Sequence, residues 1–494
     1  MQKKQTILVV ASLLVVVLSV TLAYFTAQII GKGKDVSVSS ADLKIIFTDS
    51  DGAISGSNIE PGWSDTKTFT VENNSKSEYK YNIVIKDLLN TFVTNGYLQY
   101  KITSTNGGYN MTEFKDVPKS GTATDKILAY SVVIPNGVTQ SYTIEFKYAN
   151  DESVDQSDDM GKKLSGTLFI TEGTEDPNKT LYKKLLADKS TVLTRTDFST
   201  VLTADNTKTL YTSTEDSKTV YYFAGNATDN WVKFGKNASN QDLYWRIIRT
   251  NSDGGVRLLY HGTSTTATDA VINASTAFNS SYNNIAYVSY MYGNLGSVAN
   301  ARENTTDSTI KTIIDNWYKD NLNTNYGKYL STTAVYCNDR STSDNTNFGA
   351  RTRLYTNKTP TYDCTATEDK FTVDSTVGNG KLTYPIALMT ADEVSFAGGL
   401  YNKKAPTWYY YNSANGSSTG STWWWLLSPS RWIGSVAYVF YVLGSSNPGN
   451  LSVNYVGDTG GVRPAISLKS CIKYSTGNGS ASDPYTIKET TSGC

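Results

Sequence analysis

Residues 422–468 read TWWWLLSPSRWIGSVAYVFYVLGSSNPGNLSVNYVGDTGGVRPAISL, and they set the character of the C-terminal half of the chain. Three consecutive tryptophans, Trp423 to Trp425, precede two runs with β-strand character, VAYVFYVLG and NLSVNYVG. Aromatic side chains dominate protein cores, so Trp424 and Trp425 are predicted to pack inside a β-rich domain.

Polar residues in this stretch predict a binding face on that packed frame. Ser430, Ser435, Ser445 and Thr459 are too polar for a core, and they surround the expected hairpin turns. Rigid aromatic rings combined with adaptable Ser, Gly and Asn side chains are typical of protein-binding surfaces. We therefore expect a ligand face that contains Arg431, Trp432, Tyr438, Asn447, Asn450, Asn454, Tyr455 and Asp458.

Acid–base and metal-binding machinery is sparse. The single histidine, His261, cannot build a multi-histidine zinc site, and the motif HExxH is absent. We expect His261 to be partly buried and satisfied by its neighbours, and Arg463 to hold carbonyl or carboxylate groups structurally. No catalytic residue, metal or cofactor is expected.

Composition limits the remaining possibilities. A chain of 494 residues is long enough for two or three domains. Lys plus Arg and Asp plus Glu both total 45, so nothing favours nucleic acid or an anionic membrane surface as a partner. The four cysteines form no CxxC pair, and an even number in an exported chain indicates disulfides. Of the three pairings we choose Cys337–Cys364 with Cys471–Cys494; four free thiols are the alternative.

The N-terminus predicts export. Lys3 and Lys4 precede the apolar run TILVVASLLVVVLSVTLAYF, which has roughly the length that a bilayer core requires. Everything after Phe25 is therefore expected outside the cell, at the cell surface. Residues 1–30 are either a permanent anchor in the cytoplasmic membrane or a signal segment that is cleaved on export.

Residues 31–173 alternate apolar and polar side chains with period two, which predicts an all-β antiparallel sandwich. The leader ending in AYFT, the strand ADLKI and the segment IEPGWSDTKTFTVENNSKSEYKYNIVI resemble the TasA/camelysin family of Bacillota. The resemblance implies a jelly-roll fold, and polymerisation in which an N-terminal strand is lent to a neighbouring subunit. Camelysin carries a metallopeptidase label, but this sequence contains no usual zinc-binding pattern.

Residues 174–208 are expected to be a linker with one short helix, and residues 209–494 an α+β domain. The sequence NSDGG over 251–255 predicts a hairpin turn between WRIIRT and VRLLYH. A helix is expected in STIKTIIDNWYKDNL with Ser308 or Asp307 as its cap, and another in TADEVSFAGG. Thr390 and Glu393 form a predicted capping box in the second helix, and the acidic residues of both helices are expected as caps and on the surface.

Several motifs of this half resemble, in order, a domain of unknown function in surface proteins of gut Bacillota: LYWRIIRTNSDGGVRLLYHG, YCNDR, YPIALMTADEVSFAGG, WWWLLSP and GVRPAISLKS. The order of elements also resembles the C-type-lectin-like fold of relatives of the formylglycine-generating enzyme. That resemblance implies a ligand face over residues 430–460. The calcium motifs EPN and WND and the copper-binding cysteine pair are missing, so neither calcium-dependent sugar binding nor oxidase chemistry is expected.

These observations predict an exported adhesion protein whose lectin-like head binds a protein or glycan on another cell or host surface. The alternative is an extracellular structural subunit, such as a biofilm fibre, that self-assembles through the sandwich. An enzyme ranks third, because it would require carboxylates such as Asp392 and Asp458 to converge in a cleft.

Overall fold

The computed structural model describes residues 36–40, 43–49, 53–56, 59–174, 176–177, 179–342, 346–411 and 416–494. The helix expected over residues 1–30 lies outside these ranges. Within them, no helix combines the length and the apolar character that crossing a membrane requires. The chain divides into two compact units, Met1–Pro177 and Asn178–Cys494, and each is described by itself.

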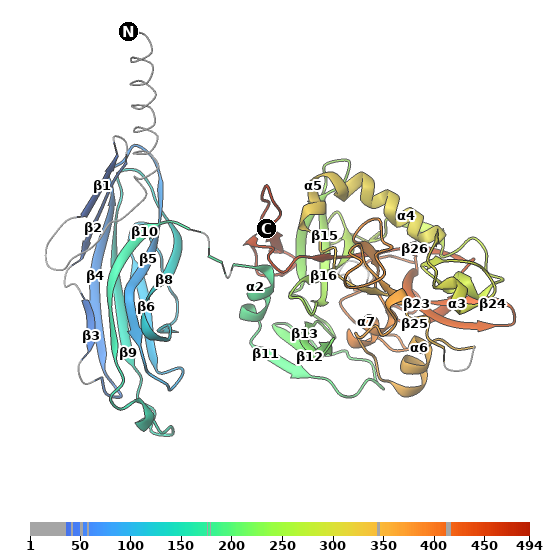
Figure 1. The fold of residues 1–494 in the computed structure, drawn as a ribbon, viewed down its shortest axis with the longest axis horizontal. Coiled ribbons are helices and arrows are strands. Elements are labelled where there is room, and N and C mark those ends of the chain that lie inside the picture. Colours follow the sequence, from blue (N-terminus) through green and yellow to red (C-terminus); the bar gives the residue numbers. More distant parts are fainter. Residues whose placement is uncertain are drawn as a thin grey trace, which may run out of the picture. The chain divides into compact units, whose positions relative to one another are not determined.

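Two antiparallel sheets that share one hydrophobic core form the first unit (Figure 1). The six-stranded sheet has the order β1-β2-β4-β9-β6-β7, with the bounds β1 Val36–Ser40, β2 Leu43–Asp49, β4 Ser64–Asn73, β9 Thr139–Tyr148, β6 Leu98–Ser104 and β7 Lys115–Asp116. The four-stranded sheet has the order β3-β10-β5-β8, with the bounds β3 Ala53–Gly56, β10 Leu164–Glu172, β5 Tyr79–Asn90 and β8 Ser120–Ile134. A short 3₁₀ helix, η1 (Ser157–Asp159), precedes β10.

Period-two alternation builds this core, as predicted. Strand β9 buries every second residue, including Tyr142, Ile144 and Phe146. These side chains belong to the same buried cluster as Ile83 of β5 and Leu168 of β10, which come from the other sheet. Because side chains alternate between the two faces of a strand, β9 turns one face toward this core. Strand β5 departs from the alternation, because all residues from Tyr81 to Ile85 are buried.

The second unit begins earlier than expected. Helix α2 (Leu181–Asp188) buries Leu181 and Leu185 in the core of this unit, and β11 (Thr191–Thr194) pairs in parallel with β12 (Thr209–Glu215). Residues 179–208 are therefore part of the second unit rather than a linker. The leucine spacing correctly predicted the helix, but it carried no signal of the distant surface against which the helix packs.

A ten-stranded sheet forms the larger part of this unit, with the main order β11-β12-β13-β15-β14-β29-β28. Strand β16 pairs with β15 and β27, and β22 joins through β27. The remaining bounds are β13 Lys218–Tyr222, β14 Trp231–Lys236, β15 Asp242–Thr250, β16 Val256–Gly262, β22 Ile386–Leu388, β27 Pro464–Leu468, β28 Tyr474–Thr476 and β29 Tyr485–Ile487.

A five-stranded sheet, β17-β26-β23-β24-β25, contains the tryptophan-rich stretch. Its bounds are β17 Asn273–Ala277, β26 Thr459–Val462, β23 Trp424–Ile433, β24 Val436–Val442 and β25 Leu451–Tyr455. Two small ribbons complete the β-structure: β18 (Met291–Tyr292) with β19 (Thr306–Asp307), and β20 (Tyr336–Cys337) with β21 (Lys370–Phe371).

Short helices surround these sheets (Figure 1). The α-helices are α3 Val298–Ala301, α4 Thr309–Tyr318, α5 Thr324–Tyr326, α6 Gly349–Arg351 and α7 Ala391–Phe396. The 3₁₀ helices are η2 Ile285–Val288, η4 Gly327–Tyr329 and η6 Thr367–Asp369, and π-helical turns occur at η3 Lys319–Asn323 and η5 Thr352–Asn357.

Local sequence signals predicted several of these elements correctly. Residues 251–255 turn β15 onto β16, and the Asn251 N–H donates to the Gly255 carbonyl at 2.8 Å. Ser308 caps α4 by accepting from the Lys311 N–H. Thr390 and Glu393 form the expected capping box of α7.

Both expected disulfides are present. Cys337 pairs with Cys364 and Cys471 with Cys494, with Cα–Cα distances of 5.7 and 5.4 Å. They close loops whose ends are 27 and 23 residues apart in the sequence. Two disulfides are consistent with an extracellular location.

Candidate ligand-binding face

The tryptophan-rich stretch forms the central strands of the five-stranded sheet. Trp424 and Trp425 at the start of β23 are completely buried, as predicted. The indole N–H of Trp425 donates to the Thr276 carbonyl at 2.8 Å, which joins β23 to β17. These tryptophans therefore belong to the frame of the sheet.

A row of three side chains crosses the other end of the sheet. Arg431 of β23 lies opposite Tyr438 of β24, and Tyr438 lies opposite Tyr455 of β25. Directly opposed residues in antiparallel strands project from the same face, so all three share one face. The Arg431 guanidinium lies 4.7 Å from the centre of the Tyr438 ring, at cation–π distance.

Tyr282 extends this row from a distant part of the sequence. Its ring packs edge to face against Tyr455, with ring centres 5.6 Å apart. Its carbonyl accepts a hydrogen bond from the Ala437 N–H at 2.9 Å, which places its loop beside the end of β25. We call Arg431, Tyr438, Tyr455 and Tyr282 the aromatic row.

The row lies next to a tight turn and reaches solvent. Gly434 and Ser435 connect β23 to β24 with φ values of 57° and 61°, the left-handed pair that a two-residue hairpin of type I′ requires. The side chain of Tyr455 is 37% exposed and that of Tyr282 is 47% exposed, while Arg431 and Tyr438 are half-buried. The row can therefore offer ring faces and one cation to a ligand.

Two predicted face residues project from the opposite side of the sheet. Trp432 follows Arg431 in an uninterrupted register, so its side chain lies on the other face, where it packs against the hydrophobic core. Asn454 precedes Tyr455 and lies opposite Val439 on that same other face. The prediction of one continuous face was wrong here, because neighbouring residues of a strand alternate in direction.

Asp458 and Asn454 stabilise the turn that holds Tyr455. The Asn454 amide donates to Asp458 Oδ2 at 2.6 Å, and the Thr459 N–H donates to Asp458 Oδ1 at 2.8 Å. The Asp458 N–H donates to the Tyr455 carbonyl at 3.1 Å. Both polar side chains therefore position the aromatic row rather than extend it.

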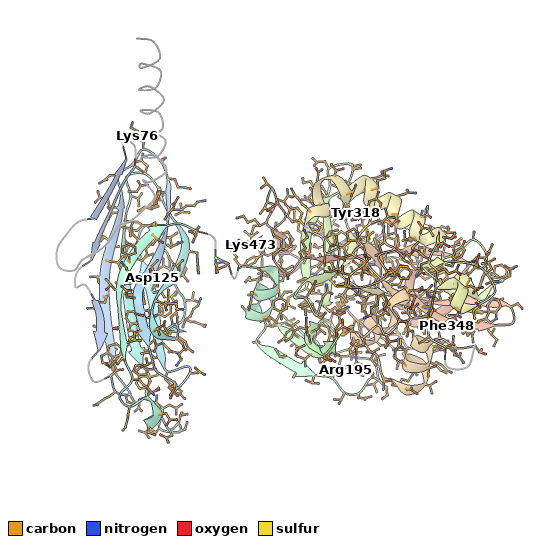
Figure 2. All side chains as sticks on the ribbon, in the orientation of Figure 1. Lys76, Asp125, Arg195, Tyr318, Phe348 and Lys473 are labelled. Carbon is orange, nitrogen blue, oxygen red and sulfur yellow. A yellow bond between two sulfur atoms is a disulfide. The ribbon has the colours of Figure 1, made fainter. Side chains whose placement is uncertain are left out.

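The remaining predicted residues lie away from the row. Asn447 is exposed, and Asn450 is buried; both belong to the loop between β24 and β25. That loop follows Val442, four residues and roughly 13 Å along β24 from Tyr438. Ser430 is also buried, against expectation, and its carbonyl accepts from the N–H of Phe348, which is labelled in Figure 2, at 3.0 Å. Polarity alone wrongly predicted that Asn450 and Ser430 would be exposed.

Arg463 supports the sheet from within, as predicted. Its Nε donates to the Tyr260 carbonyl at 2.7 Å, and its Nη1 donates to the carbonyl of Tyr409. Its Nη2 lies 3.2 Å from Nδ1 of His261, a residue that is completely buried rather than partly buried. Burial, followed by the positive charges of Arg463 and Arg246, keeps the pKa of His261 well below its usual value, so the imidazole is neutral and can accept.

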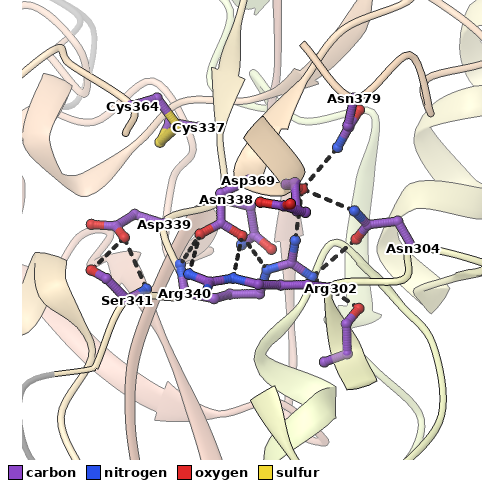
Figure 3. A network of polar contacts seen from close by, with 12 residues as sticks. Arg302, Asn304, Cys337, Asn338, Asp339, Arg340, Ser341, Cys364, Asp369 and Asn379 are labelled. Carbon is purple, nitrogen blue, oxygen red and sulfur yellow. Dashed lines mark hydrogen bonds and ion pairs between the residues drawn. A yellow bond between two sulfur atoms is a disulfide. The ribbon is translucent and has the colours of Figure 1, made fainter. Parts of the chain in front are cut away.

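A second buried arginine fixes the segment that runs beside β23 (Figure 3). Arg340 Nε and its backbone N–H donate to the two carboxylate oxygens of Asp369 at 2.8 and 2.9 Å. The neighbouring Asn338 amide donates to the Leu427 carbonyl at 2.8 Å, which connects this network to β23. The motif YCNDR is thus an anchor for the sheet.

Acidic residues of α7 are not on the surface, contrary to expectation. Glu393 is 2% exposed, and its Oε1 accepts from Arg257 Nη1 at 2.8 Å and from Arg249 Nε at 3.0 Å. Asp392 forms a bidentate pair with Arg353, both contacts being 3.0 Å. Asp392 and Asp458 are therefore engaged in separate interactions. In the described part of the chain, no three His, Cys, Asp or Glu side chains are grouped closely enough to hold a metal ion.

Comparisons of the chain with protein-family models, with curated proteins and with solved structures find no match.

Proposed function

We propose that this protein is an extracellular binding protein, whose second unit is a head with a C-type-lectin-like fold and whose first unit is a jelly-roll sandwich. The observation that carries this proposal is the aromatic row, which assembles solvent-exposed rings and a guanidinium from three strands and a distant loop. Adhesion to another cell or to a host surface is the role that fits an exported chain with such a head.

The rest of the sheet supports this interpretation. The Gly434–Ser435 turn fixes Arg431 opposite Tyr438, and Asn454 and Asp458 stabilise the turn beside Tyr455, so the rings of the row are held in place before a ligand arrives. Rigid aromatic anchors contribute binding energy at a small entropic cost, and Tyr, Trp and Arg are the residues enriched at binding hot spots.

Binding of the full chain to a panel of glycans and surface proteins tests this function. Tyr455→Ala removes an exposed ring and should weaken a specific interaction at least about tenfold, as is usual for a hot spot. Tyr455→Phe keeps the ring and should retain most of the affinity, and unchanged circular dichroism checks that both variants are folded. Equal affinities of wild type and Tyr455→Ala would contradict the assignment.

A structural role is the second candidate, and one observation favours it. Among the strands that the structure describes, β1 is an edge of the six-stranded sheet and pairs with β2 alone, so its other side could accept or lend a strand. Proline substitutions at Val36 and Val38 should then abolish filaments seen by electron microscopy. A chain that stays monomeric at high concentration would contradict self-assembly.

A further inference from the structure

Three segments without any acidic residue, one of which contains most of the aromatic row, lie next to one another in the fold. Residues 346–362, 394–411 and 423–457 contain six basic residues and no Asp or Glu, although the whole chain is neutral: Arg351, Arg353, Lys358, Lys403, Lys404 and Arg431. Asn347 forms a β-bridge with Arg431, and Tyr401 forms one with Leu451 of β25. The three segments are therefore neighbours in the fold.

Arg351 repeats the arrangement of the aromatic row. Its guanidinium lies 4.7 Å from the centre of the Tyr355 ring and 5.8 Å from that of Tyr401. The two rings pack edge to face at 4.9 Å, and the side chain of Tyr355 is 48% exposed. Lys358 adds a second cation 5.7 Å from the Tyr355 ring.

Neither Arg351 nor Arg431 has an anionic partner. In contrast to Arg249, Arg257, Arg302, Arg340 and Arg353, which all pair with carboxylates, these two form no ion pair or side-chain hydrogen bond within the described ranges. Nη1 of Arg351 and Nε of Arg431 are buried atoms that have no hydrogen-bond partner among the described residues, and each guanidinium lies over a tyrosine ring. The other arginines are held either by carboxylates or, like Arg195, Arg246 and Arg463, by carbonyl and amide oxygens, so the two without such partners mark a place for an anion from outside.

We propose that the head binds an acidic saccharide, with Arg431 and Arg351 receiving its carboxylate or sulfate groups and the adjacent tyrosines stacking on its rings. A guanidinium matches the planar carboxylate in two parallel hydrogen bonds and also binds sulfate oxygens. Sugar rings present C–H faces that pack on tyrosine. The inference rests on the proposed function and names the chemical class of its ligand.

Single-stranded nucleic acid uses a related combination of cations and aromatic rings, but it requires a groove that follows several phosphates. Here only two guanidinium groups in the described part of the chain lack a side-chain hydrogen bond, and the chain carries no net positive charge. A ligand with a few separate acidic groups fits this arrangement better.

The test compares matched oligosaccharides on the full chain: sialyllactose and lactose for the carboxylate, and sulfated and desulfated chondroitin oligosaccharides for the sulfate. We expect the acidic member of at least one pair to bind at least about tenfold more tightly than its neutral or desulfated counterpart. The affinity should fall as sodium chloride increases, because salt screens exposed charges.

Arg431→Gln and Arg351→Gln should each weaken this binding about tenfold or more, since a charge-assisted hydrogen bond is lost. Lys183→Gln on α2 removes an exposed positive charge elsewhere in the same unit and should leave affinity unchanged. The two acidic series show whether carboxylate or sulfate is the recognised group.

Three results would overturn the inference in different ways. Equal binding of acidic and neutral members, lost in Tyr455→Ala, would leave the binding function intact and refute the acidic ligand. No binding of any oligosaccharide by the folded chain would refute both this inference and a glycan-binding head. Binding of a single-stranded oligonucleotide in preference to all sugars would refute the saccharide class.

Discussion

Replacing Glu393 by glutamine tests how the second unit is held together. The Glu393 carboxylate accepts from Arg257 and Arg249, and its Oε2 accepts from the Thr390 N–H at 2.9 Å to complete the capping box. Glutamine keeps the shape of the side chain but removes its charge. Arg249 then retains Glu215 as its partner, at 2.7 Å, while Arg257 loses the one carboxylate that it contacts among the described residues.

The expected cost is large because the network is buried. Removing one partner of a buried ion pair leaves an uncompensated charge and typically costs about 3–5 kcal/mol. A unit of the size of Asn178–Cys494 has an unfolding entropy of about 0.7 kcal/mol/K near its melting temperature, so the melting temperature should fall by about 4–8 °C. Differential scanning calorimetry at neutral pH measures this shift.

Asp242→Asn is the matched control. It makes the same carboxylate-to-amide change, but Asp242 pairs with Lys233 on the surface, where both side chains are about one third exposed. A surface pair contributes roughly 0–1 kcal/mol, so the shift should stay below about 2 °C. If Glu393→Gln lowers the melting temperature no more than this control, the buried network does not contribute the stability predicted for it.

Three further predictions concern stability. Burial tends to raise the pKa of Glu393, but Arg257 and Arg249 outweigh it and hold this pKa below the usual value. The stability that this group contributes is therefore present above about pH 4.3 and is lost as the pH falls. Acid should lower the melting temperature of the wild type more than that of Glu393→Gln, and parallel curves between about pH 3 and 7 would contradict this. Replacing Cys337 and Cys364 together by serine should cost about 3.5 kcal/mol, because the open chain gains loop entropy in the unfolded state, and calorimetry of the variant should show a melting temperature lower by about 5 °C rather than an unchanged one. Deleting residues 178–208 should destabilise the second unit by at least about 3 kcal/mol, since two buried leucines of α2 are lost, and a urea midpoint equal to that of the intact chain would refute the revised domain boundary.

Local chemistry made part of the fold predictable. The capping box at Thr390, the cap at Ser308 and the turn over residues 251–255 depend on residues within a few positions of one another. Period-two alternation likewise determined the strands of the first unit. The disulfide pairing was correct because each short loop brings its cysteines together.

Long-range packing decided what the sequence could not reveal. Asn450 and Ser430 are polar, yet both are buried, and Ser430 lies beside Phe348, a residue from a distant segment of the chain. Helix α2 has the predicted leucines, but the surface that buries them comes from residues much further along the chain.

The candidate face was likewise predictable only in part. Aromatic content correctly directed attention to the hairpin of β23 and β24, but the pairing register divided its residues between two faces. Tyr282 lies about 150 positions before Arg431 and Arg351 lies 80 positions before it, and no local pattern connects either residue to the hairpin. Only the fold brings them to it.

The most direct test of the binding face is hydroxyl-radical footprinting of the full chain with and without a bound ligand from the glycan panel. The exposed rings of Tyr455, Tyr282 and Tyr355 should become protected at saturation. Met160, which is 80% exposed in the first unit, should react equally in both states and serves as the internal reference. Protection confined to these tyrosines would support the account; unchanged reactivity of all three with ligand bound would contradict it.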